Sequence, residues 1–497
     1  MKGIRRNATF CLCILFIGSM VILSTNKPHS DPIRQIVSLK EEQQIITAID
    51  PSINYTEYWG QACSSVMVTG NASKDGRAIL MKNRDWSYDP ANFPIYVPST
   101  DTTYAYIGVN TNTMGINQWG LAVMNTALPI LARSQPVEGN LILNQKILES
   151  YYSVSAIAHA LNDSRSPIGP TYRASFGNVA TCIGVIDRSG AGAFFEISNT
   201  KAYVQYVVDG YDTRANHPRI YSPYAAGPSG RDQYLLDALD EVYEKNGYIS
   251  WEHVMQNVSR YVRHKELGSV NFSIDGEACN PNTVATMVAV SGDSRYGGQL
   301  NCMWTACGPN PITSVFVPTM VCAESIPTGI VSTIVRTQEN YESAQVQTNP
   351  VDPILLNPER VREVQKYAFF AESYSIAEYD RLMSSVPEGL SDFQLKSTVE
   401  DFIDSMANIS SDIFIGETTD VVFPPLVSFP NPTPSSTAST PVPSSTPSTS
   451  TTTGTLTEST STPSESLFDI QIVAMVVGFG SGFALVMIAA IMYRRLT

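Results

Sequence analysis

Cys63 begins the segment CSSVMVT, whose small and β-branched residues predict a strand. A thiol that cleaves an amide needs a base and a group that stabilises the oxyanion. If the chain is cut between Ala62 and Cys63, the new α-amine has an unperturbed pKa of roughly 8, which suits proton transfer near neutral pH. Such a nucleophile requires no catalytic histidine. The chain has 5 histidines among 497 residues, and this scarcity favours the idea.

Two alternatives for Cys63 remain open at this stage. In an oxidising compartment, the cysteines from Cys63 onward would suit disulfides, with Cys63 in one of the bridges. A Cys-His hydrolase is the other alternative, with His217 as the natural base. The histidines lack the paired spacing of a zinc site, and the glycine-rich segments lack a phosphate-binding pattern. We therefore expect neither a metal nor a cofactor.

The order of the expected strands and helices from Cys63 onward predicts the α+β class. Lys74-Asp75-Gly76 is a hairpin turn signal after the first strand. Apolar spacing predicts one helix over about 141–161. Further strands are expected at 78–81, 104–110, 120–124, 181–186, 192–197, 202–208, 284–290 and 314–317, and further helices at 232–245, from about 251, and between 357 and 407. Strands that do not alternate regularly with helices favour antiparallel sheets covered by helices.

Five blocks follow one another along residues 63–320 and carry a family resemblance. They are CSSVMVTGNASKDGRAILMKNRDW at 63–86, MGINQWGLAVMNTAL at 114–128, RANHPRI at 214–220, SGRDQYLLDAL at 229–239 and WTACGPNPITSVFVP at 304–318. In this order, they resemble motifs of the N-terminal nucleophile (Ntn) hydrolases of the choloylglycine hydrolase superfamily. The nearest branches look like the isopenicillin N acyltransferase-like hydrolases and the related cysteine dipeptidases.

The resemblance implies a four-layer αββα sandwich and a set of catalytic roles. Cys63 would attack the carbonyl, and its own α-amine would shuttle the proton. Asp85 would orient that amine and stabilise its ammonium form. Asn125 and Asn216 would donate hydrogen bonds to the oxyanion or the amine, and Arg231 would hold the network in place electrostatically.

The chain departs from the family pattern at several positions. Lys82 occupies the position of an arginine in the bile-salt branch, and Arg84 lies beside Asp85. Lysine lacks the guanidinium fork, so we expect a different substrate set, with Lys82 and Arg84 as candidate substrate-binding residues. The third block has Ala215 before Asn216 where much of the family has threonine. The fifth has one more residue between Gly308 and Pro311.

Both ends of the chain carry membrane signals. Lys2, Arg5 and Arg6 precede an apolar run, which predicts a signal peptide or signal anchor over 1–26. Residues 470–493 are long and apolar enough to span a bilayer, and Arg494 and Arg495 after them predict a cytoplasmic end. The expected order is a propeptide at 27–62, the Ntn-hydrolase domain at 63–345, a helical extension at 346–425, a Ser/Thr/Pro-rich stalk at 426–466, and a transmembrane anchor with a short tail at 467–497.

These features predict a cell-surface enzyme with its catalytic domain outside. Asn-X-Ser/Thr sites at Asn54, Asn71, Asn162, Asn257, Asn271 and Asn408 fit a glycosylated surface. The net charge of −14 argues against nucleic acid as a partner. The expected function is self-processed cleavage of small peptides or N-acyl amides through a thioester, or acyl transfer. The alternative is a catalytically inactive Ntn scaffold that binds a surface ligand.

Overall fold

The computed structural model describes residues 37–38, 63–86, 92–109, 112–131, 139–228, 230–261, 270–271, 278–280, 282–346 and 355–419. Most of the expected propeptide lies outside these residues, and so do the expected signal, stalk and transmembrane anchor. In the described part, no helix is long and apolar enough to cross a membrane. The description below concerns the unit that ends before residue 434.

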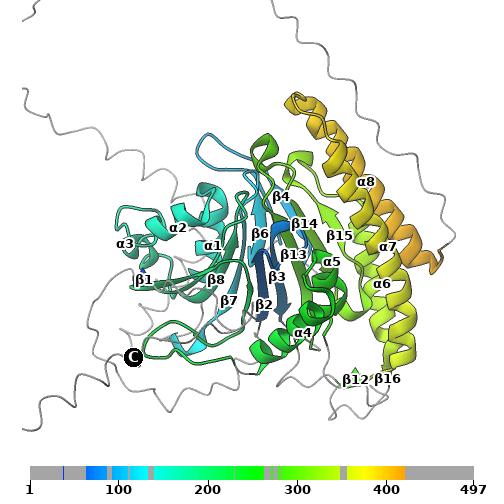
Figure 1. Ribbon diagram of the computed structural model, residues 1–497, viewed down its shortest axis with the longest axis horizontal. Helices are drawn as coiled ribbons and strands as arrows, with labels where there is room; N and C mark the ends of the chain where they lie inside the picture. The colour runs from blue at the N-terminus through cyan, green and yellow to red at the C-terminus, as the bar shows by residue number, and fades with distance from the viewer. Residues whose placement is uncertain are drawn as a thin grey trace, which may run out of the picture. The chain divides into compact units, whose positions relative to one another are not determined.

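Two antiparallel sheets stack on one another in the described residues (Figure 1). The larger has the order β1-β10-β9-β8-β7-β6-β5-β4, with β1 at Val37–Ser38, β4 at Pro94–Val97, β5 at Tyr106–Val109, β6 at Met114–Asn117, β7 at Ala122–Ala127, β8 at Ala180–Ile186, β9 at Gly192–Ser198 and β10 at Ala202–Val207. The smaller has the order β11-β2-β3-β13-β14-β15, with β2 at Cys63–Gly70, β3 at Gly76–Asp85, β11 at Tyr211–Arg214, β13 at Thr283–Ser291, β14 at Cys302–Cys307 and β15 at Val317–Thr319. A short third sheet joins β12 (Val270–Asn271), β17 (Leu355–Leu356) and β16 (Gln345–Val346).

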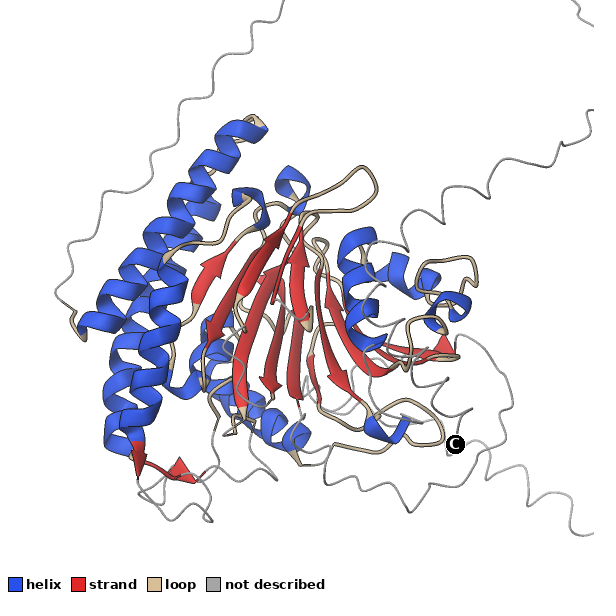
Figure 2. Cartoon of the chain, turned by 180° about the vertical axis from the view of Figure 1, so that it is seen from behind, coloured by secondary structure: helices blue, strands red, loops and turns tan. Residues whose placement is uncertain are grey.

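Helices cover the outer faces of both large sheets (Figure 2). On the larger sheet lie α1 (Gly139–Ser150) and α2 (Val154–Ala160), followed in the chain by α3 (Pro170–Arg173). On the smaller sheet lie α4 (Arg231–Asn246), α5 (Trp251–His253) with a π-helical turn at Val254–Val258, α6 (Gly329–Ala344), α7 (Pro358–Ser385) and α8 (Asp392–Gly416). Short 3-10 turns occur at Pro129–Leu131, Arg295–Gly298, Pro311–Thr313 and Val321–Ala323.

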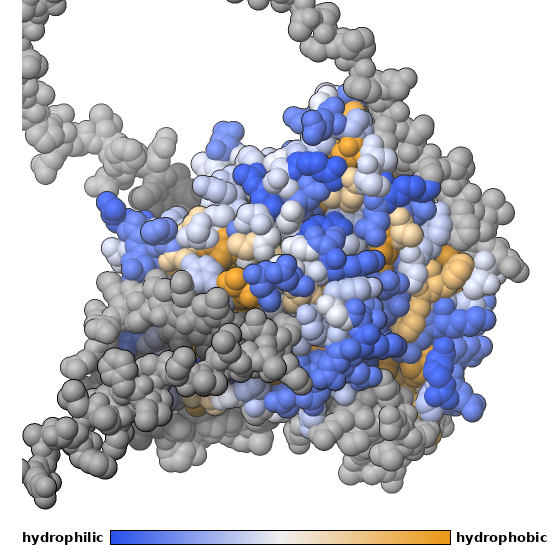
Figure 3. Space-filling model, viewed as in Figure 1, coloured by the Kyte–Doolittle hydropathy of each residue, from blue (hydrophilic) through white to orange (hydrophobic). Residues whose placement is uncertain are grey.

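Three apolar cores separate these layers. One lies between the sheets and contains Met67, Leu80 and Met124. The other two fill the space between each sheet and its helices. The order is therefore helix, sheet, sheet, helix, which confirms the predicted α+β class with two antiparallel sheets and covering helices. The side of this unit that Figure 3 shows is mostly hydrophilic, with small, separate hydrophobic areas.

One predicted helix is wrong in its extent. The apolar spacing predicts a single helix over 141–161, but the structure has α1 and α2 with a break between them. Ser153 causes the restart, because its side chain accepts a hydrogen bond from the backbone nitrogen of Ala156 at 3.2 Å. A serine in this extended conformation satisfies an amide at the start of a new helix. Apolar spacing alone does not reveal such a cap.

The long helices α7 and α8 belong to the same packed unit as the smaller sheet. Tyr379 and Phe402 lie in one core with Trp304 of β14. Charged groups also join α7 to the segments next to the sheet. Arg260 and Glu372 form a buried ion pair at 2.6 Å, and Glu372 accepts the backbone N–H of Phe316, just before β15, at 3.0 Å. The sequence did not fix whether these helices would form a separate unit, and the packing places them on the sheet.

Removal of the Glu372 charge should destabilise this unit. Glu372→Gln leaves Arg260 buried without its counter-ion, and we expect a loss of about 3–5 kcal/mol in the free energy of unfolding. Chemical denaturation of the purified protein measures this loss. Glu363→Gln on the same helix is the matched control, since that side chain is 53% exposed in its ion pair with Arg360. We expect about 0–1 kcal/mol there. Equal losses in the two variants would contradict the assigned role of Glu372.

Candidate active site

Cys63 is the first residue of β2, and its side chain points to the inner face of the smaller sheet. Its backbone N–H donates to Oδ1 of Asn216 at 2.7 Å. Side chains alternate between the faces of a strand, so Cys63 shares the inner face with Met67 of the core between the sheets. The residue is 8% exposed. The nitrogen of Cys63 thus has a polar partner from the segment that follows β11 (Tyr211–Arg214).

The register of β2 against β3 places two cations beside this thiol. Cys63 lies opposite Arg84, and Lys82 is two residues away on the same face. The Lys82 ammonium donates to Oδ1 of Asn125 at 3.0 Å and to the carbonyl of Thr113 at 3.3 Å. Burial lowers the pKa of Lys82 to about 8, a shift that the Cys63 thiol and its hydrogen bond with Lys82 oppose. Lys82 therefore connects the strand beside Cys63 to β7.

Arg84 adds a second buried positive charge at the same end of the strand. Its guanidinium donates to the side chain of Asn92 and lies 5.5 Å from the ring centroid of Trp86. The charge of Arg84 also lowers the pKa of Lys82. Cations on one face of a buried strand favour negative charge next to them. This part of the site suits a group that becomes anionic, such as the oxygen of an attacked carbonyl.

Asn216 has an orientation that its other hydrogen bond fixes. Its Nδ2 donates to the carbonyl of Ala127 at 2.8 Å, so Oδ1 must face the Cys63 nitrogen. In this arrangement, Asn216 accepts from that nitrogen, whereas the family resemblance implied that it donates. Asn125 can present its amide nitrogen to the site instead, because its Oδ1 already accepts from Lys82. Its Nδ2 is therefore the group of Asn125 that can donate to a substrate oxygen.

Asp85 and Arg231 meet on the other face of the same sheet. Arg231 donates to Asp85 at 2.8 Å, and the same carboxylate accepts from Asn280 at 2.7 Å and from Thr283 at 2.6 Å. Burial raises the pKa of Asp85 to about 6, although Arg231 and the hydrogen bonds from Thr283 and Asn280 lower it. The structure thus brings Asp85 to Arg231 rather than to Cys63. The role of Asp85 at a free α-amine stays a prediction for the cleaved chain.

Asn280 and Thr283 are site residues that the sequence reasoning missed. They lie almost 200 residues after Asp85, and they reach it because β13 pairs with β3 so that Thr283 lies opposite Asp85. No local pattern marks them. Asn83 in the same motif has a structural role, because its side chain binds the carbonyls of Ser259 and Ala278 at 2.9 and 2.7 Å.

His217 does not contact Cys63 within the described residues. Its Nε2 lies 3.0 Å from Oδ2 of Asp232 and 3.2 Å from the carbonyl of Gly227. The alternative in which His217 is the base of the thiol therefore has no contact to support it. The disulfide alternative has no support in the described part of the chain, where Cys63 is a free, buried thiol.

Comparisons with known proteins found structural likeness alone. No protein-family model matches the chain, and no curated protein matches it. Two crystal structures of variants of a conjugated bile acid hydrolase from Clostridium perfringens align with it. The first has 15% sequence identity and a TM-score of 0.32, and the alignment covers 49% of this chain and 89% of that chain. The second has 16% identity and a TM-score of 0.31, with the same coverage.

Proposed function

We propose that this chain is a self-processed cysteine hydrolase of the Ntn type that cleaves linear carbon-nitrogen amide bonds, with Cys63 as its nucleophile. The observation that carries the proposal is the polar environment of Cys63. Asn216 accepts its backbone N–H, and the pairing of β2 with β3 places the buried Lys82 on the same face of the sheet as its thiol. A cysteine that merely fills a core has no need of a buried lysine and a buried amide at both its polar groups.

Self-processing would begin from the intact bond between Ala62 and Cys63. The Cys63 thiol adds to the carbonyl carbon of Ala62, the carbon-nitrogen bond breaks, and the nitrogen takes up a proton to become the α-amine. A thioester then joins the preceding segment to the sulfur. Water hydrolyses this thioester, which releases the segment as a carboxylate and restores the thiol. Asn216, which binds the Cys63 nitrogen, holds the leaving group in place during this step.

Turnover would use the same atoms on a second amide. The α-amine accepts the thiol proton as sulfur attacks the substrate carbonyl, and it later donates that proton to the departing amine. The oxyanion would lie near Lys82 and the Nδ2 of Asn125, where positive charge and a donor are already buried. Water completes hydrolysis of the thioester, and an amine in its place would give acyl transfer. Small peptides and N-acyl amides are the proposed substrates.

We also propose that the enzyme is exported and anchored by residues 470–493. Support comes from the sequence signals at both ends and from the acceptor asparagines of the glycosylation sites. Asn71, Asn162, Asn257 and Asn408 are all exposed, as glycan attachment requires.

The N-terminus of the mature protein is the direct test of the nucleophile. We expect the wild-type chain to begin at Cys63, and Cys63→Ala to keep the preceding segment and to lose amide hydrolysis, because both steps need the same sulfur. N-terminal sequencing and a screen of dipeptides and N-acyl amides measure these results. Cys322→Ala is the matched control, since Cys322 is also a buried free thiol but lies in the core on the helical side. It should be processed normally.

An intact segment before Cys63 in the wild-type chain would refute the self-processed nucleophile. Hydrolysis of the same substrate by Cys63→Ala would equally rule it out. A processed chain that hydrolyses none of the amides would favour the inactive scaffold.

The pH dependence of turnover should report on Lys82. Its pKa of about 8 means that Lys82 is positively charged below that pH and loses this charge as the pH rises above it. The α-amine, with an ordinary pKa of roughly 8, must be neutral to act as the base, so the rate falls toward acid. We expect kcat/KM to peak near pH 8 for the amide that the wild-type protein hydrolyses fastest.

Two substitutions at Lys82 separate these effects. Lys82→Met should lower kcat/KM by about 100-fold or more, because a charge at the oxyanion is lost. Lys82→Arg keeps its charge at high pH, so the alkaline decline should move to higher pH while the acid decline stays. An unchanged alkaline decline in Lys82→Arg would show that another group titrates there.

A further inference from the structure

The segment that carries Asn216 is fixed by partners along its whole length. Ser65 of β2 donates to the carbonyl of Arg214 at 2.9 Å, and Thr126 of β7 donates to the carbonyl of Ala215 at 2.8 Å. Beyond Asn216, the carboxylate of Glu196 accepts three backbone N–H groups. They belong to Arg219, Ile220 and Tyr221, at 2.6, 2.9 and 2.7 Å. Residues of both sheets therefore hold the segment of Asn216 in place.

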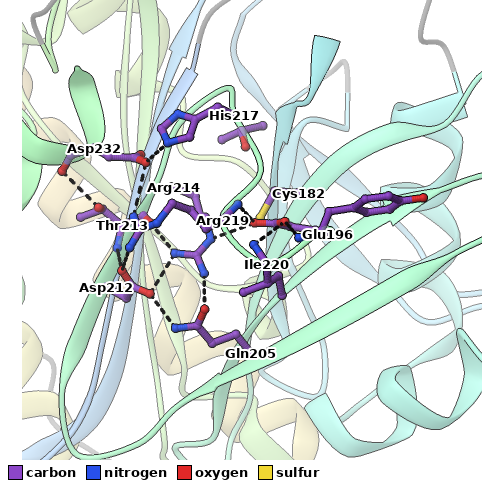
Figure 4. A network of polar contacts seen from close by, with 12 residues as sticks. Cys182, Glu196, Gln205, Asp212, Thr213, Arg214, His217, Arg219, Ile220 and Asp232 are labelled. Atoms are coloured by element: carbon purple, nitrogen blue, oxygen red, sulfur yellow. Dashed lines mark hydrogen bonds and ion pairs between the residues drawn. The ribbon is translucent and has the colours of Figure 1, made fainter. Parts of the chain in front are cut away.

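A buried group of charges lies beneath this segment (Figure 4). Arg214 contacts Asp212 at 2.9 Å and Glu196 at 3.4 Å. Arg219 lies 3.4 Å from Asp232 and 3.7 Å from Asp212. These three carboxylates face two guanidinium groups, so the group carries one excess negative charge. The neighbouring Cys182 does not change the net charge of the group. Burial raises the pKa of its thiol well above the ordinary value, so the thiol stays neutral.

His217 is the sixth member of this group and the one with a titratable cation. It follows Asn216 in the chain, and its Nε2 lies 3.0 Å from Oδ2 of Asp232. The other oxygen of Asp232 has no hydrogen-bond partner within the described residues, so its charge depends on the partners of Oδ2. The hydrogen bond with Asp232 raises the pKa of His217, while burial and Arg219 lower it. When His217 is protonated, three positive charges face the three carboxylates and the net charge of the group is zero.

The contact between His217 and Asp232 also joins the two halves of the candidate site. Asp232 follows Arg231 at the start of α4, and Arg231 binds Asp85. The contact therefore ties the segment of Asn216 to the helix that binds Asp85. Figure 4 shows the imidazole pointing at the Asp232 carboxylate, away from Cys182 and Glu196 on the far side of Arg214.

We propose that His217 and Asp232 are a positioning pair that holds Asn216 against the nitrogen of Cys63, and that they do so best when His217 is protonated. This proposal rests on the proposed function. A neutral His217 can still donate one hydrogen bond, but the buried group then keeps an uncompensated negative charge, which is unfavourable. The segment becomes easier to displace, Asn216 leaves the Cys63 nitrogen more often, and both self-processing and turnover slow down.

The test compares the processing rates of two chains across pH. The full-length wild type and His217→Gln are made by cell-free translation and transferred to buffers from pH 6 to pH 9. The appearance of the chain that begins at Cys63 is followed by mass spectrometry. We expect His217→Gln to be roughly 10-fold slower at pH 6, as for loss of a charge-assisted hydrogen bond. At pH 9 the two rates should converge, because the wild-type imidazole is then neutral. Titration of Lys82 cancels in this ratio.

Two further variants complete the design. Asp232→Asn should be slow at pH 6, because it weakens the contacts with both His217 and Arg219. Its combination with His217→Gln should be no slower than Asp232→Asn alone, since the contact with His217 is already lost there. His159→Gln is the matched control, because His159 is exposed on α2. It should follow the wild type at every pH.

Each outcome bears on a defined statement. A ratio of wild type to His217→Gln that stays constant from pH 6 to pH 9 would reduce His217 to a structural residue and overturn the proposal. Additive effects of the two substitutions would do the same. A wild-type chain that never begins at Cys63 would instead overturn the proposed function, on which the positioning pair depends.

Discussion

The pairing of β2 with β3 decides which side chains meet at Cys63. The turn at Lys74–Gly76 joins the two strands, and Gly76 adopts a φ of 79° that most side chains disfavour. The register shifts once, between Val68 and Gly70, and then continues to Cys63 opposite Arg84. A slip of one residue would move every side chain of one strand to the opposite face. Lys82 and Arg84 would then point at the helices, and the thiol would lose both cations. The chemistry at Cys63 thus depends on a turn at the other end of the hairpin.

The same alternation separates the buried charges by face. Lys82 and Arg84 lie on the inner face with the thiol, whereas the Asp85 carboxylate lies on the outer face with Arg231. If Asp85 lay on the inner face at the position of Lys82, it would place a negative charge where the proposed reaction needs a positive one. On the outer face, it binds donors from α4 and β13 and fixes the end of β3. One strand thereby places cations beside Cys63 on one face and an anion that binds α4 and β13 on the other.

Residues of the first block were predictable because their signals are local. The turn, the strand at Cys63 and the class of the fold follow from spacing within a few residues. Asn125, Asn216 and Arg231 could be selected only through the resemblance, and their partners could not. The contact of Lys82 with Asn125 spans 43 residues, and that of Asn280 with Asp85 spans 195. Such contacts depend on strand order, which local periodicity does not encode. The contact of His217 with Asp232 was not predictable for the same reason.

Because β1 lies within the expected propeptide, removal of the propeptide would also affect the larger sheet. Val37 and Ser38 pair with Val204 and Tyr203 of β10, so they form the outermost strand of the larger sheet. Cleavage before Cys63 would turn this strand into part of a separate peptide, held at this edge by non-covalent pairing. Its departure would leave one side of β10 with unsatisfied backbone groups, and such an edge readily accepts another strand. Maturation would then change the surface that the molecule offers to other chains as well as the chemistry at its thiol.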